Sequence, residues 1–350
     1  MTDSHRDAPY DAVLIVAFGG PEGMEDVMPF LENVLAGRNV PHSRMLQVAE
    51  HYRLFNGISP LNSQMRALKA TLQAELNTHG PHLPVYWGNR NWHPFLVETL
   101  RQMAQDGVRR ALALFTSAYS SYSSCRQYRE DIARAQAEVG PTAPQVDKLR
   151  VYYNHPGFIA PNIANLRDAL EQIPLDRRKA TRLVFTGHSL PIAMARYSAY
   201  EHQLREACRL VAGGVDIGEW DLVFQSRSGS PQTPWLGPDI LDHMSVLRDQ
   251  GAGDVIVHPI GFISDHMEVL YDLDVEARQH AQQLGLNMVR VATVGTHPMF
   301  ISMIRELIEE RLTPTAERRA LGRYGPSHDV CPPDCCPAGE TMRPRTEMPQ

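Results

Sequence analysis

Apolar runs of strand length alternate along the chain with stretches of helical periodicity. The runs are nearly continuous in Val, Ile, Leu and Phe, which is typical of parallel strands that are covered on both faces. They lie at residues 12–18, 83–87, 110–115, 149–153, 182–185, 222–225, 255–259 and 288–294. Helical patterns lie at about residues 24–36, 62–77, 94–106, 124–138, 161–173, 196–212, 237–250, 274–284 and 298–312. This order, strand then helix, predicts two doubly wound, Rossmann-like α/β domains, each with a parallel sheet flanked by helices.

The length and the change of composition near the end divide the chain further. At 350 residues the chain is long enough for two domains. We predict an N-terminal α/β domain at residues 10–155 and a C-terminal α/β domain at residues 156–297. A helix at residues 298–314 could return to the first domain, and residues 315–350 form a short, Cys-containing tail. The last dozen residues are predicted to be disordered because they are rich in Pro and charge.

Charge and hydropathy exclude several classes of function. The formal net charge of -6 and the lack of a basic run argue against a nucleic-acid partner. No stretch of about 18 apolar residues is present to span a membrane, and the first residues lack the apolar core of a secretory signal. We therefore predict a cytoplasmic protein, with a soluble monomer as the default state.

Three carboxylates are spaced four residues apart near one predicted helix. On a helix, this spacing places Glu268, Asp272 and Glu276 on one face. Three like charges repel one another unless a cation, a proton or water relieves them, and the residues between them are largely apolar. The pattern favours a route for cations or protons. The alternative is an ordinary charged helix edge that faces solvent.

A histidine follows the strand that is expected to open the second domain. His188 lies in the turn after residues 183–187, where the active sites of α/β proteins are found. The same turn mimics the G-x-S-x-G elbow of hydrolases, with Ser189 as the nucleophile. However, Pro191 stands where that elbow needs its last glycine.

Other stretches could line a cleft. Residues 19–23 form a Gly-rich turn after the first strand, but the phosphate-binding spacing is absent, so we favour a close approach of backbone to a flat ligand. Residues 51–62 combine aromatic, basic and hydroxyl groups at a helix start, and residues 119–129 form a hydroxyl-rich loop after a strand. Each can equally be an ordinary connector or a solvated helix start.

Three of the five cysteines are crowded in the tail, at Cys331, Cys335 and Cys336. In a reducing compartment such a group more often binds metal than forms disulfides. Adjacent Cys335 and Cys336 can bind one small cluster only through a distorted turn. Cys208 lies in a helical pattern, where it is expected to act as a small buried hydrophobe.

Taken together, these motifs resemble the ferrochelatase family in order and spacing. The resemblance covers roughly residues 10–312, and in detail the chain is similar to the actinobacterial coproporphyrin III ferrochelatases, which often carry a [2Fe-2S] cluster. The matching stretches are residues 18–21, 57–60, 185–191, 225–227, 234–236 and 259–272.

The resemblance implies a chelatase-type fold and a lyase that inserts Fe²⁺ into a porphyrin in haem biosynthesis. Coproporphyrin III is the expected substrate and coprohaem the product, with transient contact with neighbouring haem-pathway enzymes. The implied metal-binding and catalytic pair is His188 and Glu268. The implied proton or metal relay is Asp272 and Glu276. The implied porphyrin contacts are Tyr52, Ser59 and Tyr128.

Two further consequences follow from the resemblance. Some relatives have an axial tyrosine ligand for iron near the end of the first strand, and Phe18 stands there in this chain. The cluster-bearing relatives use one upstream and three C-terminal cysteines, which implies a [2Fe-2S] cluster held here by Cys125, Cys331, Cys335 and Cys336.

Other functions stay open at this point. A protoporphyrin IX ferrochelatase, or a cobalt or nickel chelatase for another tetrapyrrole, would use the same kind of site. A serine hydrolase built on Ser189 would cleave esters, and a non-catalytic porphyrin-binding protein would bind the macrocycle without changing it.

Overall fold

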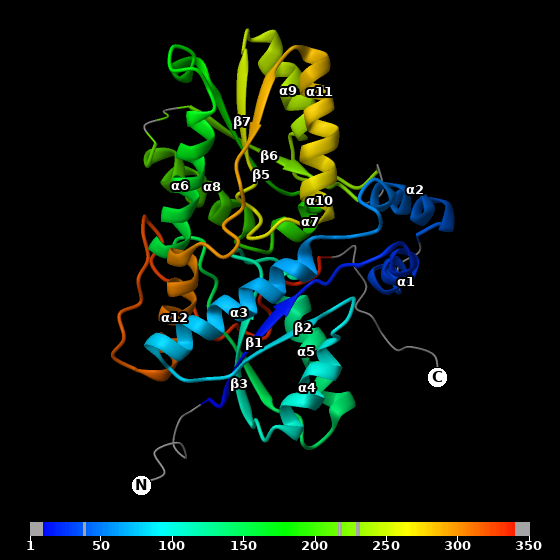
Figure 1. The fold of residues 1–350 in the computed structure, drawn as a ribbon, viewed down its shortest axis with the longest axis vertical. Coiled ribbons are helices and arrows are strands. Elements are labelled where there is room, and N and C mark those ends of the chain that lie inside the picture. Colours follow the sequence, from blue (N-terminus) through cyan, green and yellow to red (C-terminus); the bar gives the residue numbers. More distant parts are fainter. Residues whose placement is uncertain (1–9, 38–39, 216, 218, 229–231, 340–350) are drawn as a thin grey trace.

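The computed structural model describes residues 10–37, 40–215, 217, 219–228 and 232–339. It shows two α/β domains, whose sheets lie at opposite ends of the long axis (Figure 1). Each described sheet has four parallel strands, in the order β2-β1-β3-β4 in the first domain and β6-β5-β7-β8 in the second. The strands are β1 (Ala12–Ala17), β2 (Val85–Asn89), β3 (Arg110–Phe115), β4 (Gln145–Lys148), β5 (Arg182–His188), β6 (Trp220–Gln225), β7 (Asp254–His258) and β8 (Asn287–Arg290). The predicted fold class is confirmed.

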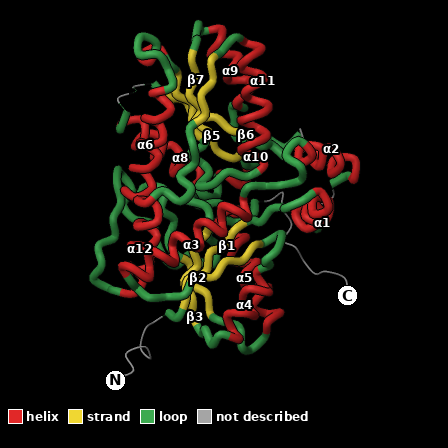
Figure 2. Tube along the Cα trace, in the orientation of Figure 1, coloured by secondary structure: helices red, strands yellow, loops and turns green. Residues whose placement is uncertain are grey.

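Helices cover both faces of each sheet (Figure 2). In the first domain they are α1 (Met24–Leu35), α2 (His42–Arg53), α3 (Leu61–His79), α4 (Leu96–Gln105), the π-helix η1 (Tyr122–Arg126) and α5 (Gln127–Val139). In the second they are α6 (Pro156–Glu171), the 3-10 helix η2 (Arg178–Ala180), α7 (Ile192–Ala195), α8 (Tyr200–Gly213), α9 (Ile240–Asp249), α10 (Met267–Val269), the π-helix η3 (Leu270–Ala277) and α11 (Arg278–Leu284). The last described helix, α12 (Pro298–Leu312), packs against both α3 and α6.

The central strand of the first sheet shows why its sequence is continuously apolar. Every residue of β1 is buried. Val13 and Ile15 face a core that includes α3, whereas Leu14 and Val16 face a separate core built with α4 and α5. Because alternate side chains enter different cores, neither face can carry a polar residue cheaply.

The fourth strand was predicted wrongly at residues 149–153. The strand β4 is Gln145–Lys148, a partly exposed edge strand whose polar residues gave no apolar signal. The apolar residues after it form a buried connector, in which the Tyr152 hydroxyl donates to the Phe115 carbonyl at 3.1 Å.

Two helices were missed, and one began earlier than predicted. Helix α2 buries only Tyr52 among its residues, so its periodicity was weak, and α7 is too short to show any. The helical segment predicted at residues 274–284 begins at Met267, as α10 and then η3.

The strand order of the second sheet creates a crevice beside β5. The chain passes from β5 to β6 on one side of the sheet and then to β7 on the other side of β5. Such a switch point opens a crevice at the carboxyl ends of the two strands that flank it. The turn after β5 and the loop after β7 therefore meet at that edge of the sheet.

The start of the tail is anchored to the first domain by buried polar contacts. Arg150, whose side chain is 1% exposed, donates to both carboxylate oxygens of Glu310 at 2.7 and 2.8 Å. Arg150 also donates to the Arg319 carbonyl, and Asn154 donates to the Gly325 carbonyl, both at 2.8 Å. The tail therefore follows a defined path as far as the cysteines. Residues 340–350, where disorder was predicted, lie outside the described residues.

Among the described residues, no helix is long and apolar enough to cross a membrane. The cytoplasmic location stays a prediction.

Candidate functional site

His188 and Glu268 meet at the switch point of the second sheet. His188 is the last residue of β5, and Glu268 lies in α10, at the end of the loop that follows β7. The His188 Nε2 atom is 3.6 Å from the Glu268 Oε1 atom. Their side chains are 30% and 47% exposed, so the pair is open to a ligand on one side.

A close approach of two glycines brings these elements together. A Cβ atom added to Gly261, in the loop after β7, would lie 2.7 Å from the Gly187 Cα atom. The Gly261 amide donates to the Thr186 carbonyl at 3.0 Å, which fixes the loop against the end of β5. Any side chain at Gly261 would push this loop, and Glu268 with it, away from His188.

Hydrogen bonding leaves one nitrogen of His188 available for chemistry. The Nδ1 atom is 2.6 Å from the Ser189 carbonyl oxygen, which can only accept, so Nδ1 carries a hydrogen. The Nε2 atom, which faces Glu268, therefore holds either the second proton or a free lone pair. Burial would lower the pKa of His188, but the Glu268 carboxylate outweighs it and raises the pKa. Burial would raise the pKa of Glu268, and His188 lowers it. Near neutral pH, these two shifts favour an imidazolium–carboxylate ion pair.

Asp272 is tied to the same site by a glutamine at the end of β6. The Gln225 Nε2 atom donates to the Glu268 carbonyl at 2.9 Å and approaches Asp272 Oδ2 at 3.5 Å. The Gln225 Oε1 atom accepts from the Thr186 hydroxyl at 2.8 Å, and the Ser226 hydroxyl donates to Asp272. Gln225 therefore links β5, β6 and the helical segment that carries the carboxylates.

The three carboxylates interact along a segment that is mostly π-helical. Glu268 is in α10, whereas Asp272 and Glu276 are in η3, whose hydrogen bonds are wider than those of an α-helix. Burial, then the Glu268 carboxylate, raise the pKa of Asp272 to about 7. Burial, then Asp239, raise the pKa of Glu276, whose residue is exposed. The series runs from the His188–Glu268 pair to Glu276, with a carboxyl group between them that can exchange a proton near neutral pH.

The raised pKa of Asp272 predicts how stability depends on pH. The pKa of an Asp in the unfolded chain is about 3.9. Between about pH 4 and pH 7, Asp272 in the folded chain therefore holds a proton that the unfolded chain has lost. Asp272 therefore contributes a free energy of unfolding that falls as pH rises through this range. The free energy of unfolding of Asp272→Asn, taken relative to wild type, should rise with pH, as measured by urea unfolding at several pH values. The exposed Asp249→Asn variant is the control, and identical slopes in wild type and Asp272→Asn would contradict the assignment.

Aromatic and basic side chains line the approach to the pair from the first domain. The Phe18 ring is 6.2 Å from the Phe30 ring, which is 6.1 Å from the Tyr52 ring. The guanidinium of Arg90 lies 4.5 Å from the centre of the Tyr128 ring and 5.8 Å from that of Phe18. Burial, then Glu268, raise the pKa of Tyr52. Tyr52 packs in one apolar cluster with Met267, the residue before Glu268, whereas Tyr128 lies farther along the same series of rings.

Ser59 lies beside the Gly-rich turn after β1. It is 4% exposed, and its amide donates to the Pro21 carbonyl at 2.9 Å. A Cβ atom at Gly20 would lie 2.7 Å from the Ser59 Cβ atom, so the glycine permits this contact. The rings of His51 and Tyr271 stack at 3.7 Å and join α2 to η3.

Ser189 is poorly placed to act as a hydrolase nucleophile. It is 2% exposed, and its hydroxyl donates to the Leu236 carbonyl at 2.8 Å. A nucleophilic serine must instead donate to a base, and His188 contacts the Ser189 carbonyl rather than its hydroxyl. The structure therefore disfavours the esterase alternative.

Two polar residues of this site were not assigned a role from the sequence. From the sequence, Gln225 was considered only as part of a cleft-lining turn. Its position at the end of β6, the strand beside β5, could have identified it as a site residue. His266 caps α10 by accepting from the Glu268 amide at 3.2 Å through Nδ1. An N-cap position two residues before a candidate catalytic carboxylate was the signal that could have identified it.

Comparison with known proteins identifies the family of this chain. The sequence profile of the Ferrochelatase family matches residues 10–312. The chain belongs to the ferrochelatase family. The match includes both sheets, helix α12 and the His188–Glu268 pair.

Individual relatives of this ferrochelatase chain are similar along nearly their whole length. The chain is 54% identical over 329 residues to a protein of Rhodopirellula baltica named Ferrochelatase, covering 94% of this chain and 93% of that protein. It is 49% identical over 360 residues to a protein of Streptomyces griseus named Coproporphyrin III ferrochelatase, covering 97% and 96%. Among solved structures, SirB from Bacillus subtilis with Fe3+ shares the fold, with a TM-score of 0.55 and 12% identity over 89% of this chain and 99% of that one.

The ferrochelatase chain also gathers four of its five cysteines at a second place. Cys125 is buried in η1, and its thiol interacts with that of Cys331, which in turn interacts with that of Cys335. The sulfurs of Cys335 and Cys336 are 3.6 Å apart. All five cysteines are free thiols, and Cys208 is buried in α8. We call Cys125, Cys331, Cys335 and Cys336 the thiol site.

The backbone supplies the distorted turn that the adjacent cysteines require. Cys336 has a φ angle of +53°, a left-handed conformation that few residues other than glycine adopt. This turn allows Cys335 and Cys336 to direct their sulfurs to one place. His328 is a neighbour that sequence reasoning missed, since its ligand atom and those of Cys331 and Cys335 lie within 4.8 Å of one another. Its position three residues before Cys331 was the signal.

Proposed function

We propose that this ferrochelatase inserts Fe²⁺ into coproporphyrin III to form coprohaem in haem biosynthesis. The observation that carries the proposal is the His188–Glu268 pair, 3.6 Å apart at the switch point and backed by a carboxyl group with a pKa near neutrality. The Streptomyces griseus relative named Coproporphyrin III ferrochelatase supports the choice of porphyrin.

The pair has the groups that metal insertion needs. A ferrous ion must exchange water for protein ligands, and imidazole nitrogen and carboxylate oxygen both bind it. We assign the first ligand to His188 Nε2 and the second to Glu268. Because the resting pair shares a proton, binding of the cation displaces that proton and replaces the ion pair.

Two protons must leave the porphyrin as the metal enters. His188 Nε2 can accept one of them once the metal has moved from the protein to the macrocycle. Asp272, hydrogen-bonded to Ser226, can take up and release a proton near pH 7, and Glu276 lies at the exposed end of the segment. We assign Asp272 and Glu276 to proton and metal traffic between the His188–Glu268 pair and solvent.

The porphyrin would occupy the approach from the first domain. We assign contacts with the macrocycle to Tyr52, Ser59 and Tyr128. Phe18 is 37% exposed at the end of β1, and its phenyl ring offers a flat apolar surface without a ligand atom. No axial bond to iron can come from this position.

Anaerobic turnover with two porphyrins tests the proposal. Purified enzyme is given Fe²⁺ with either coproporphyrin III or protoporphyrin IX, and the porphyrin spectrum is followed. We expect kcat/KM to be at least about tenfold higher for coproporphyrin III, because its additional propionates can form charge-assisted hydrogen bonds. Equal values or a preference for protoporphyrin IX would contradict the substrate, and no insertion with either would contradict the function.

We further propose that the thiol site holds a [2Fe-2S] cluster. Four thiolates are the usual ligand set for such a cluster, and Cys125, Cys331, Cys335 and Cys336 offer four sulfurs at one place. The thiol site therefore fits the group, which when bound supplies one-electron chemistry. The residues themselves join η1 to the tail, so the group would fasten the two segments.

Replacing one thiol tests this assignment. Cys125→Ser should lose most of the iron and acid-labile sulfide of anaerobically purified protein, together with its visible absorbance, because only three thiolates remain. Cys208→Ala is the matched control and should keep the iron, the sulfide and the absorbance, since Cys208 is buried in α8 away from the thiol site. A Cys125→Ser protein with unchanged iron and sulfide would contradict the ligand set.

Contact with neighbouring haem-pathway enzymes stays a prediction.

A further inference from the structure

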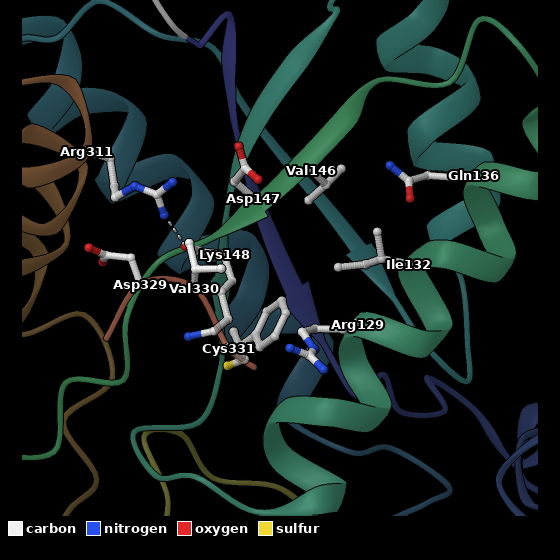
Figure 3. Close-up of a pocket in the computed structure, with 11 residues that line it drawn as sticks. Arg129, Ile132, Gln136, Val146, Asp147, Lys148, Arg311, Asp329, Val330 and Cys331 are labelled. Atoms are coloured by element: carbon white, nitrogen blue, oxygen red, sulfur yellow. Dashed lines mark hydrogen bonds between the residues drawn. The ribbon is translucent and has the colours of Figure 1, made fainter. Parts of the chain in front are cut away.

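A cavity of about 200 Å³ borders the thiol site, and it contains three basic side chains. Figure 3 shows Lys148 and Arg129 pointing toward the Cys331 sulfur. Lys148 ends the edge strand β4, and Arg129 is in the first turn of α5, which follows the π-helix that carries Cys125. The two cations therefore come from two different elements of the first domain.

Lys148 is unusual because it is buried without a counter-charge. Its residue is 9% exposed, and within the described part of the chain no carboxylate forms an ion pair with its ammonium group. A buried charge without a partner is costly, and proteins rarely keep one. Arg129 is half-buried and also has no ion pair with any described carboxylate.

The acidic residues of the cavity do not balance these two cations. Asp147 accepts from Arg110 at 2.6 and 2.9 Å and from the Tyr10 hydroxyl at 3.0 Å. Asp329 pairs with Arg318 at 3.1 Å. With these two carboxylates already paired, the Cys331 sulfur is the remaining group among the residues that line the cavity that can carry negative charge.

Lys148 and Arg129 line the same cavity as the Cys331 thiol. Cations at this place stabilise negative charge on the sulfur, as a thiolate-bound group requires.

We propose that Lys148 and Arg129 are the counter-charges of the thiol site and set the reduction potential of the group that it holds. This inference rests on the proposed [2Fe-2S] cluster. Four thiolates and two sulfides outweigh the charge of the irons, and reduction adds one more negative charge. Nearby cations stabilise the reduced form more than the oxidised form, so they raise the potential and help retain the cluster.

The test uses Lys148→Met, which keeps a long side chain but removes the charge, with Lys148→Arg as the control that keeps it. A redox titration of the holoenzyme follows the visible spectrum, and iron and sulfide are measured per chain. At the potential that half-reduces the wild-type cluster, Lys148→Met should show a ratio of reduced to oxidised cluster about tenfold lower. This corresponds to about 59 mV for one electron. Lys148→Arg should stay near wild type.

Arg129→Gln provides a second variant in case Lys148→Met does not fold, since Arg129 is half-buried. It should shift the potential in the same direction. If both neutral variants keep the wild-type potential and cluster content, the counter-charge inference is wrong while the cluster stands. If the wild-type protein contains no iron and sulfide, the cluster proposal fails and the inference fails with it. The inference is supported if the reduction potential becomes more negative in Lys148→Met and Arg129→Gln but not in Lys148→Arg.

Discussion

Replacing His188 with Ala should lower the rate of iron insertion by at least about 100-fold, because a positioned acid–base group contributes 10²–10⁴-fold and this one is also assigned as a metal ligand. The change removes the His188 Nε2 atom, which lies 3.6 Å from the Glu268 Oε1 atom. Steady-state insertion with coproporphyrin III and Fe²⁺ measures the loss. Porphyrin affinity, measured by fluorescence, should change little because the assigned porphyrin contacts come from the first domain.

The control for this experiment is another histidine variant that leaves the crevice intact. His79 is exposed at the end of α3 and pairs with Glu75 at 3.3 Å, so His79→Ala should insert iron at the wild-type rate. Near-normal turnover by His188→Ala would refute its assigned role. Loss of porphyrin binding together with turnover would show that His188 acts on the macrocycle rather than on the metal.

The second large effect is expected at Glu268. Glu268→Gln keeps the size of the side chain but removes the charge that holds the proton on His188, and it should slow insertion by about 100-fold. Asp272→Asn and Glu276→Gln alter the path to solvent and should each slow insertion by only about 3- to 10-fold. The comparison of kcat for the three variants under one set of conditions measures this order.

A different order would change the account. If Asp272→Asn were as slow as Glu268→Gln, the carboxyl group tied to Gln225 and Ser226 would be part of the chemistry rather than of the relay. If all three variants were equally mild, the carboxylates would be an ordinary helix edge. The pH dependence of kcat in each variant separates these cases, because the pKa of Asp272 is about 7.

Much of the fold follows from short-range patterns in the sequence. Strands such as β1 are buried on both faces, so their apolar runs are continuous, and His188 at the end of such a strand could be placed at an active-site edge. The edge strand β4 could not be found in this way, because its partly exposed residues Gln145–Lys148 are polar. The strand was instead predicted at residues 149–153, the apolar connector that follows β4.

The parts of the site that depend on three-dimensional contacts were not readable from the sequence. The π-helical conformation of η3 has no signature in residues 270–277, although the four-residue spacing of its carboxylates did mark the segment. Gln225 acts through two strands and a helix at once, and no local pattern reveals that. In the sequence, Lys148 is one charge just before the strand predicted at residues 149–153, and only its burial beside Cys331 distinguishes it.

The location of a bound divalent metal shows whether His188 and Glu268 form the metal-insertion site. Crystals of the enzyme grown with Fe²⁺ under anaerobic conditions, or with Zn²⁺ as a redox-inert substitute, can be measured by anomalous diffraction at the metal edge. The account predicts anomalous density within bonding distance of His188 Nε2 and a Glu268 carboxylate oxygen, and its loss in His188→Ala. Metal at the thiol site alone, with none between His188 and Glu268, would contradict the assignment of this pair as the metal-insertion site.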